Sequence, residues 1–247
     1  MQTPPKTIIL IPTYNESENV ESLLPAVLAV ASHYEILVID DGSPDGTADL
    51  VKGLIAQFPG RIHLMERKQK AGLGTAYIAG FKWALERNYE LVFEMDCDFS
   101  HPPSSLPALE KACVEEGFDL AVGSRYTKGG KVQNWPMNRL MLSYGASLYV
   151  RLITGMPVKD PTAGFICYKS KLLSKLNLDR VRFIGYAFQI EMKYKSYLHG
   201  ARIKEVPITF KDREKGVSKM STKIFKEGLL GVVVLRMEKA ARLGKGV

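Results

Sequence analysis

Two aspartates, two positions apart, follow an apolar run near the middle of the chain. Residues 91–95 read LVFEM and favour a strand, and Asp96 and Asp98 come as that run gives way to a loop. Side chains two apart on an extended chain project to the same side. These carboxylates could therefore hold one Mg²⁺ or Mn²⁺ ion and leave positions open for substrate phosphates. The pair could equally form an ordinary acidic turn, in which Asp only accepts local backbone hydrogen bonds.

Polar clusters also follow two earlier apolar runs. Residues 7–11 and 35–39 predict strands, and they end at residues 12–16 (PTYNE) and 40–46 (DDGSPDG). Asp40 and Asp41 could accept hydrogen bonds from the base or ribose of a nucleotide, or they could simply form the turn. Ligands of parallel sheets bind at the carboxyl ends of strands. We therefore expect the polar clusters after all three strands to converge on one edge of a sheet.

Strand-like and helix-like segments alternate along the whole chain. The predicted strands are residues 7–11, 35–39, 62–66, 91–95, 120–123, a short segment ending at Tyr168, and 202–210; the predicted helices are residues 17–32, 47–58, 75–87, 103–116, 135–157, 186–198 and 221–243. This alternation predicts an α/β fold with a mostly parallel central sheet and helices on both faces. No repeat, low-complexity tract or linker interrupts it, so we expect residues 1–247 to form a single domain.

The glycines of Gly72-Leu73-Gly74 could suggest a phosphate-cradling loop. A dinucleotide fingerprint needs G-x-G-x-x-G after the first strand. Here the glycines follow the third strand, and Tyr77 occupies the position of the third glycine. We interpret them as the closely packed start of a helix near the site. The chain has no P-loop signature, no G-x-S-x-G elbow and no histidine pair at a metal-ligand spacing, so the sequence supports neither a P-loop NTPase nor a nucleophilic hydrolase.

Basic residues outnumber acidic ones, 34 to 26, which gives a net charge of +8 and favours anionic partners. A late loop carries Arg213 and Lys219, which could fold over a diphosphate or belong to a solvated charge run. Arg139 and Arg151 interrupt the mostly apolar residues 135–157. Their stems could lie along lipid while their charged heads meet phosphate, or they could sit at the rim of a core helix.

The widely spaced Cys97, Cys113 and Cys167 favour reduced thiols in the cytoplasm. The N-terminal apolar run is too short for a secretory signal, and no run reaches the roughly 20 apolar residues of a membrane span. We therefore expect a cytoplasmic protein without a transmembrane segment. Residues 135–157 and 221–243 could be interfacial helices on a membrane surface, or they could pack in the core or against another subunit. The oligomeric state stays open.

Several segments together resemble a known family. They are PTYNE (12–16), IDDGSPDGT (39–47), GLGTAY (72–77), MDCDFSHPP (95–103), GSRY (123–126), DPTAGF (160–165), GYAFQIEM (185–192) and EVPITFKDREKGVSK (205–219). In this order they resemble family 2 glycosyltransferases and, within these, the dolichol-phosphate (polyprenol-phosphate) mannosyltransferases. The resemblance covers essentially the whole chain and implies the A-type glycosyltransferase fold, the nucleotide-diphospho-sugar transferase fold.

The resemblance also implies roles for particular side chains. The donor-binding residues would be Pro12, Tyr14, Glu16, Ile39, Asp41, Asp96, Cys97, Arg125, Arg213 and Lys219, of which the first five would surround the guanosine. The metal ligands would be Asp98, Ser100 and Asp96, and the catalytic residues Asp98, Arg125 and Arg139, the last facing the acceptor phosphate. Cys97 stands where the family usually has Ala, and Ser100 where some relatives have Gln. Many bacterial relatives carry C-terminal membrane spans, whereas this chain ends at Val247.

By the same resemblance, the enzyme would move mannose from GDP-mannose to a polyprenyl (dolichyl-type) monophosphate, with inversion at the anomeric carbon and with Mg²⁺ or Mn²⁺ as cofactor. We expect a peripheral membrane surface, but no nucleic acid, as a further partner. Two alternatives remain. One is a transferase of the same fold that uses a UDP-sugar on the same lipid, and the other is a non-catalytic nucleotide- or lipid-phosphate-binding module.

Overall fold

The computed structural model describes residues 3–185, 187–213 and 231–237. A seven-stranded sheet has the order β3-β2-β1-β4-β7-β5-β8, and β6 pairs with β9 in a small separate sheet. The strands are β1 (Thr7–Thr13), β2 (Tyr34–Asp40), β3 (Ile62–Glu66), β4 (Leu91–Glu94), β5 (Leu120–Ser124), β6 (Lys131–Gln133), β7 (Ile166–Lys169), β8 (Ile203–Pro207) and β9 (Thr209–Lys211). In the large sheet, β7 runs antiparallel to both of its neighbours, whereas the other pairs are parallel. The predicted mostly parallel sheet is therefore confirmed.

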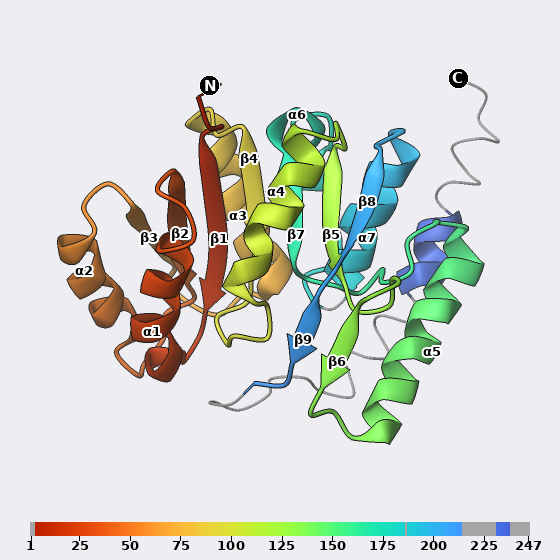
Figure 1. Cartoon of the computed structure of the whole chain (residues 1–247), viewed down its shortest axis with the longest axis horizontal. Coiled ribbons are helices and arrows are strands. Elements are labelled where there is room, and N and C mark those ends of the chain that lie inside the picture. Colours follow the sequence, from red (N-terminus) through yellow and green to blue (C-terminus); the bar gives the residue numbers. More distant parts are fainter. Residues whose placement is uncertain (1–2, 186, 214–230, 238–247) are drawn as a thin grey trace.

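Helices cover both faces of this sheet (Figure 1). They are α1 (Ser17–Leu28), α2 (Thr47–Gln57), α3 (Leu73–Glu86), α4 (Leu106–Val114), α5 (Met137–Thr154), α6 (Ser170–Leu173) and α7 (Ala187–Leu198), with short 3₁₀ turns η1 (Pro103–Ser105) and η2 (Leu178–Arg180); residues 231–237 are also helical. Side chains of α1, α2 and α4 pack in the core on one face, and those of α3, α6 and α7 pack on the other. Within the described residues, none of these helices is both long and apolar enough to cross a membrane.

The composition of β1 shows why these residues form a central strand. Ile8 and Leu10 pack in the core with α3, whereas Ile9 and Ile11 pack in the opposite core with α1. Side chains alternate between the two faces of a strand, and a strand that is covered on both faces must be apolar at every position. All four are fully buried. The continuous β-branched and leucine run in the sequence is therefore the signature of a strand in the middle of the sheet.

The chain order places a crevice next to β1. The chain runs from β1 to β2 and β3 on one side, and then returns to place β4 on the other side of β1. At such a reversal of strand order, the loops after the two neighbouring strands diverge to opposite faces and leave a ligand crevice at the carboxyl edge. The loops after β1 and β4, which carry Glu16 and Asp98, border this crevice.

The structure corrects the predicted elements in two places near the site. The predicted strand over residues 202–210 is two strands, because β8 ends at Pro207 and Ile208 passes from the large sheet to the small one. The Ile208 amide donates to the Ser124 carbonyl (3.1 Å), and the Ile208 carbonyl accepts from the Lys131 amide (2.9 Å). The segment between the predicted strand over residues 120–123 and the predicted helix over residues 135–157 contains β6, which is too short and too exposed to show a strand pattern in the sequence.

Other differences concern the ends of helices. α1 ends at Leu28 and not near residue 32, and η1 precedes α4 where a single helix over residues 103–116 was predicted. α5 begins after Pro136 and ends before Gly155, whose backbone is left-handed (φ 68°). Of the predicted helix over residues 221–243, the structure describes residues 231–237, which are helical.

Candidate functional site

A cavity of about 580 Å³ opens at the carboxyl edge of the large sheet. It is lined by residues that follow β1, β2 and β4, and also by residues from the end of β5, the start of α5, the loop before β7, the start of α7 and the end of β9. The sequence-predicted residues on its wall are Pro12, Tyr14, Glu16, Asp41, Asp96, Cys97, Asp98, Ser100, Arg125, Arg139 and Arg213. The predicted convergence of the three polar clusters on one edge is therefore confirmed.

One of the predicted site residues that the structure describes does not line this cavity. The side chain of Ile39 is fully buried in the core with α3, and a Cβ added at Gly80 would lie 2.7 Å from its Cδ1. The prediction that Ile39 lines a guanosine pocket is therefore wrong for its side chain, because its position on β2 points it at the α3 face. Lys219 lies outside the described residues.

The turn after β2 separates the roles of its two aspartates. Asp40 is buried and accepts hydrogen bonds from Thr13 Oγ1 (2.8 Å) and from the amide of Ser43 (2.9 Å), so it fixes the turn. Asp41 lines the cavity, where its Oδ1 lies 3.0 Å from Arg67 Nη1. Burial raises the pKa of Asp41 above its ordinary value, although the Arg67 guanidinium opposes this shift. Turn chemistry therefore explains the first carboxylate, and the second faces the cavity.

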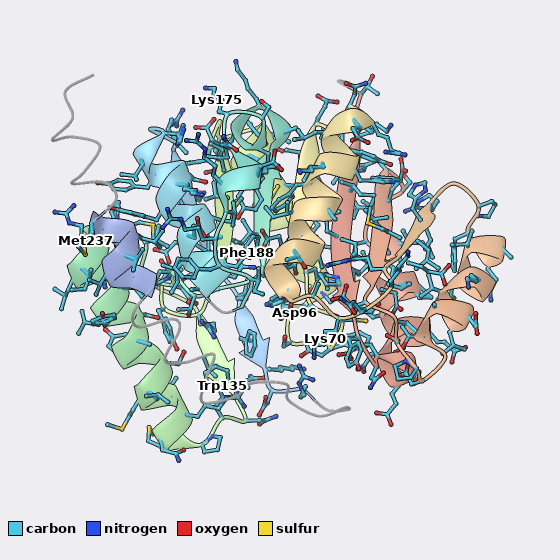
Figure 2. All side chains as sticks on the ribbon, turned by 180° about the vertical axis from the view of Figure 1, so that it is seen from behind. Lys70, Asp96, Trp135, Lys175, Phe188 and Met237 are labelled. Carbon is cyan, nitrogen blue, oxygen red and sulfur yellow. The ribbon has the colours of Figure 1, made fainter. Side chains whose placement is uncertain are left out.

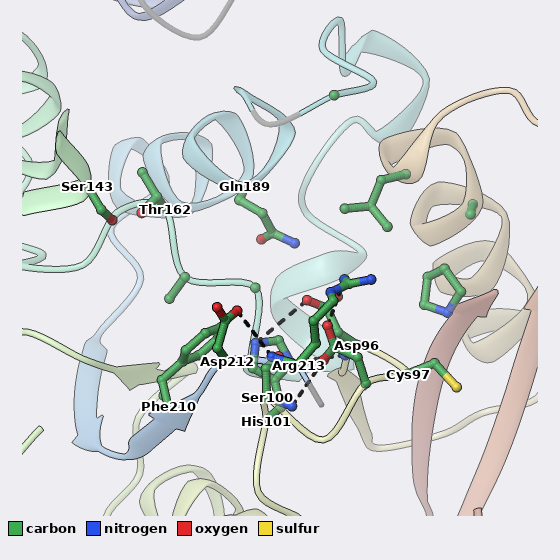
Figure 3. Close-up of a pocket in the computed structure, with 18 of the residues that line it drawn as sticks. Asp96, Cys97, Ser100, His101, Ser143, Thr162, Gln189, Phe210, Asp212 and Arg213 are labelled. Atoms are coloured by element: carbon green, nitrogen blue, oxygen red, sulfur yellow. Dashed lines mark hydrogen bonds and ion pairs between the residues drawn. The ribbon is translucent and has the colours of Figure 1, made fainter. Parts of the chain in front are cut away.

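The loop after β4 places several oxygen atoms together on the cavity wall (Figure 3). Asp98 Oδ1 accepts from the Ser100 amide (3.0 Å), and its Oδ2 accepts from Arg213 Nη2 (2.8 Å). The side chain of Asp96 is 41% exposed, into the cavity. Burial by the surrounding protein, together with the carboxylates of Asp98, Glu94 and Glu16, raises the pKa of Asp96 to about 8. A bound cation would favour the ionised forms of these crowded carboxyl groups, so the loop is suited to one.

The buried side chain of His101 holds the backbone of this loop at Asp96 through a hydrogen bond. Its Nδ1 accepts a hydrogen bond from the Asp96 amide (3.0 Å), and its ring stacks on Phe165 with the centroids 5.0 Å apart. Burial lowers the pKa of His101 to about 4, so the ring is neutral at pH 7. Because Nδ1 is an acceptor, Nε2 carries the proton and faces the carboxylate of Asp96 at 3.9 Å.

Hard oxygen ligands in this loop fit a divalent cation. The candidates are the carboxylates of Asp96 and Asp98 and the hydroxyl of Ser100, whose Oγ is buried and has no hydrogen-bond partner among the described residues. The part of the chain that the structure describes holds no group of three His, Cys, Asp or Glu side chains able to bind a metal. Mg²⁺-type sites often use only one or two carboxylates and complete their coordination with substrate phosphates and water. The donor set matches that arrangement.

Arg125 is held by a buried acidic partner. Its Nε and Nη2 donate to the two carboxylate oxygens of Asp160 (2.8 and 2.7 Å), and Nη2 also donates to Thr162 Oγ1 (2.8 Å). Both members of the Arg125–Asp160 pair are almost completely buried, with 6% and 0% of their side chains exposed. Arg125 therefore ties the end of β5 to the loop before β7, in addition to lining the cavity.

Two consecutive residues after β9 cross the cavity and form ion pairs with opposite walls. Asp212 pairs with Arg139 of α5 (2.8 Å), whose guanidinium also lies 4.1 Å from the Trp135 ring centroid. Arg213 pairs with Asp98 of the loop after β4 (2.8 Å). Through these pairs, the two consecutive residues Asp212 and Arg213 contact two of the three residues predicted to be catalytic, Arg139 and Asp98.

The glycines at the start of α3, Gly72 and Gly74, have the packing role that the sequence predicted. Gly72 has a positive φ of 98°, and a Cβ at Gly74 would lie only 2.7 Å from the Phe183 carbonyl oxygen and from Phe188 Cδ2. The start of α3 thus packs against the segment that leads into α7, and Gly72 lines the cavity.

Replacing Gly74 by Ala is expected to lower the free energy of unfolding by about 1–3 kcal/mol, because the methyl group overpacks a rigid contact. Gly53→Ala on α2 is the matched control. An added Cβ there meets nothing within 4 Å, so the higher helix propensity of Ala should raise stability by up to about 1 kcal/mol. Urea unfolding followed by circular dichroism measures both changes. A change in the free energy of unfolding with the same sign in the two variants would refute the packing argument.

Several residues on the cavity wall were not singled out from the sequence. Lys70 lies 4.4 Å from the ring centroid of Tyr14, Trp135 lies beside Arg139, and Gln189 lies on the first turn of α7. Figure 2 shows Lys70, Asp96 and Trp135 toward the same end of the molecule and Lys175 at the opposite end. Lys70 follows the end of β3, so the strand-end rule could have identified it. Gln189 belongs to the segment 185–192 that contributes to the family resemblance, but no role was predicted for any residue of that segment.

Comparison with known proteins gives a family. The model of "Glycosyl transferase family 2" matches residues 8–181. Among curated proteins, the polyprenol monophosphomannose synthase of Mycolicibacterium smegmatis is 47% identical over 227 residues, which cover 92% of this chain and 85% of that protein. The undecaprenyl-phosphate mannosyltransferase of Micrococcus luteus is 44% identical over 92% of each chain. The dolichol-phosphate mannosyltransferase of Pyrococcus furiosus is 36% identical over 91% of this chain and 62% of that protein.

Solved structures agree in fold. Glucosyl-3-phosphoglycerate synthase from Mycobacterium tuberculosis, in complex with Mn²⁺, UDP and glucosyl-3-phosphoglycerate, has a TM-score of 0.68 and 19% identity, with 94% of this chain and 80% of that chain covered. The mannosyltransferase PcManGT from Pyrobaculum calidifontis, in complex with GDP-Man and Mn²⁺, has a TM-score of 0.62 and 18% identity, with 97% and 65% covered. The predicted A-type glycosyltransferase fold is confirmed. The chain is an enzyme that belongs to glycosyl transferase family 2.

Proposed function

We propose that this glycosyltransferase transfers mannose from GDP-mannose to a polyprenyl monophosphate and releases GDP, and that residues 1–247 act as one catalytic domain. The observation that carries the proposal is the single cavity that gathers the loops after β1, β2 and β4 opposite three arginines. The names of the three curated relatives support mannose as the sugar and a polyprenyl phosphate as the acceptor. The complex of PcManGT with GDP-Man supports the nucleotide.

The donor occupies the part of the cavity next to β1 and β2. Tyr14, Glu16 and Asp41 line the place of the guanosine, where a carboxylate can accept from the N–H groups of guanine. Asp98, Asp96 and Ser100 would hold a divalent cation, Mg²⁺ or Mn²⁺, which would supply positive charge next to the diphosphate of the leaving GDP. Arg213 already lies beside Asp98, so its guanidinium is placed to bind diphosphate oxygens.

The acceptor approaches from the α5 side. Arg139 is 40% exposed on that wall and can exchange the Asp212 carboxylate for a phosphate monoester. A phosphate monoester has a second pKa of about 6, so it is largely dianionic at neutral pH and needs no strong general base. Catalysis then rests on positioning and on stabilising the negative charge of the departing GDP. Direct attack from the opposite face of the sugar inverts the anomeric carbon.

Transfer of labelled mannose tests this proposal directly. The protein is incubated with labelled GDP-mannose, undecaprenyl phosphate and Mg²⁺ or Mn²⁺, and the organic phase is counted after extraction. The expected result is lipid-bound label that depends on the lipid and on the metal. Label that appears only with UDP-glucose or UDP-GlcNAc would instead show the same fold with a UDP-sugar donor. Binding of GDP without any product from any donor would show a non-catalytic binding module.

We also propose that the protein binds the cytoplasmic membrane surface peripherally, through α5. Its exposed apolar side chains recur every three or four residues and form the α5 stripe: Met137, Met141, Tyr144, Leu148 and Leu152. Helical positions with this spacing share one face. Arg139 and Arg151 lie on the same helix, and the whole chain carries +8, which fits a surface of anionic lipid.

Placing one charge in the α5 stripe is expected to weaken vesicle binding by about 10-fold or more, because a carboxylate would enter the apolar layer. We predict this for Leu152→Asp, whose side chain is 75% exposed in the free protein. Val114→Asp, on the exposed end of α4, is the matched control and should leave binding unchanged. Flotation with phosphatidylglycerol-containing vesicles at low salt measures both. Equal flotation of the two variants contradicts the proposal, and a change in sedimentation of the lipid-free protein would assign the stripe to self-association.

A further inference from the structure

Gln189 occupies the middle of the cavity and has no part in the function proposed above. It lies on the first turn of α7, its side chain is almost completely buried, and it lines the cavity (Figure 3). The guanosine side, with Tyr14 and Asp41, lies beyond the loop after β4, and the acceptor side, with Arg139, lies on α5. An amide at this intermediate position is uncharged and can both donate and accept hydrogen bonds.

Two buried charged residues fix the orientation of this amide. Gln189 Nε2 donates to the carboxylate of Glu94, and Lys193 Nζ lies 3.5 Å from Gln189 Oε1. Glu94 and Lys193 are both completely buried. Lys193 can only donate hydrogen bonds, so it faces the amide oxygen, and the carboxyl oxygen Oε2 of Glu94 accepts from the amide nitrogen. Rotating the amide by 180° would turn its N–H groups toward the Lys193 ammonium group and its oxygen toward the carboxyl oxygen of Glu94.

The same lysine fixes the neighbouring wall. Lys193 Nζ also donates to the carbonyls of Ala163 (2.5 Å) and Gln189 (3.1 Å). The loop before β7 is therefore anchored to α7 at Ala163, next to Gly164, which lines the cavity. Lys193 thus joins the backbone at Gln189 to the wall of the site.

Gly164 keeps open the space that Gln189 faces. A Cβ added at Gly164 would point between Gln189 Nε2 (3.6 Å) and His101 Cε1 (3.7 Å). Nε2 therefore borders the space beside Gly164, and an amide nitrogen has a second hydrogen besides the one that it donates to Glu94. Because Asp96 adjoins His101 on the same wall, this space lies next to the place of the diphosphate.

We propose that Gln189 is a specificity-determining residue, which donates a hydrogen bond from Nε2 to one hydroxyl oxygen of the hexose being transferred. This inference rests on the proposed transfer of a hexose from a nucleotide donor. Glu94 and Lys193 act as positioning residues, because they select the orientation in which the amide presents its N–H. A hydroxyl that lies against a fixed donor is recognised by its position on the ring, which separates one hexose from its epimers.

The test compares deoxy-sugar donors on wild type and Gln189→Met. Met removes the amide while it keeps the length of the side chain. In wild type, one of the GDP-deoxymannoses should lose about 10- to 100-fold in kcat/KM relative to GDP-mannose, because its missing hydroxyl leaves Nε2 unpaired. Gln189→Met should lose a similar factor with GDP-mannose and no further factor with that deoxy donor. Such non-additivity identifies a direct contact.

Two controls separate recognition from structural damage. The affinity for GDP, which lacks the sugar, should stay within about twofold of wild type in Gln189→Met if the nucleotide region is intact. Glu94→Gln keeps the shape but allows the amide to rotate, so it should weaken the preference for GDP-mannose over GDP-glucose with little change in GDP affinity. Gln57→Met, an exposed glutamine at the end of α2, should behave as wild type.

The proposal on Gln189 is overturned if every deoxy donor loses the same factor in Gln189→Met as in wild type. It is also overturned if the affinities for GDP and GDP-mannose fall together, since that result indicates damage to the fold. If wild type transfers no sugar from GDP-mannose, the donor assignment fails and the role of Gln189 does not. The same comparison is then made with deoxy analogues of the nucleotide sugar that wild type does use.

Discussion

Asp98→Asn is expected to lower kcat/KM by about 10³-fold or more. Asp98 offers the more buried carboxylate of the loop after β4, with 6% of its side chain exposed. Coordination of a divalent cation contributes several kcal/mol to stabilising the charge of a departing diphosphate, and each 1.36 kcal/mol is a factor of ten in rate. Asn keeps the size of the side chain but removes the charge. Initial rates of mannosyl transfer over a titration of Mn²⁺ measure the loss.

The control for this prediction is Asp49→Asn, on the exposed face of α2, which should retain wild-type activity. The dependence of the rate on Mn²⁺ concentration is a second readout. It separates loss of metal binding from loss of the ion pair between Asp98 and Arg213. If Asp98 binds the ion, the variant should need a much higher Mn²⁺ concentration for half-maximal rate. Near-normal activity with an unchanged requirement for Mn²⁺ would defeat the assignment.

Asp160→Ala is expected to lower the free energy of unfolding by about 3–5 kcal/mol, because it leaves the Arg125 guanidinium buried without its carboxylate. Asp160 is completely buried and binds Arg125 through both of its oxygens. The control is Asp212→Ala, which breaks the more exposed pair with Arg139 and should cost at most about 1 kcal/mol. Urea unfolding at pH 7 measures both. An equal loss of unfolding free energy in the two variants would contradict the claim that the buried ion pair matters more than the exposed one.

The pH dependence provides a further check on Asp160. Burial alone would raise the pKa of this carboxyl group, but Arg125 outweighs burial and holds the pKa below its ordinary value. A lowered folded-state pKa stabilises the protein above the unfolded value of about 3.9, and this contribution is lost as the pH falls through the folded-state pKa. The difference in stability between wild type and Asp160→Ala should therefore be constant near neutral pH and shrink below about pH 4.

Most of the large sheet could be predicted because its strands are buried on both faces. Such strands are continuous apolar runs, and each is followed by a polar loop. The run from Ile8 to Ile11 illustrates this, since neighbouring residues pack into opposite cores and all must be apolar. The strand-end rule then placed Glu16, Asp41 and Asp98 on one cavity, although they come from three separate parts of the sequence.

The contacts that complete the site join residues far apart in the chain, and local patterns do not record them. Arg125 pairs with a residue 35 positions later, and Asp98 with a residue 115 positions later. The pairing of β6 with β9 is equally remote, and each of these strands has only three residues. The role proposed for Gln189 was not predicted for a related reason, although residues 185–192 contribute to the family resemblance. Its importance comes from Glu94 and Lys193, which give the amide one orientation, and a helical pattern shows only that these residues are polar.

Binding of GDP with and without Mn²⁺ tests the central claim most directly. The claim is that the loops after β1, β2 and β4 bind a nucleoside diphosphate and a divalent cation together. Isothermal titration calorimetry should show GDP binding that weakens by about 5- to 150-fold when the metal is removed with EDTA, and the affinity for Mn²⁺ should rise by the same factor when GDP is present. GDP affinity that is the same with and without metal, or no binding of GDP at all, would contradict the account.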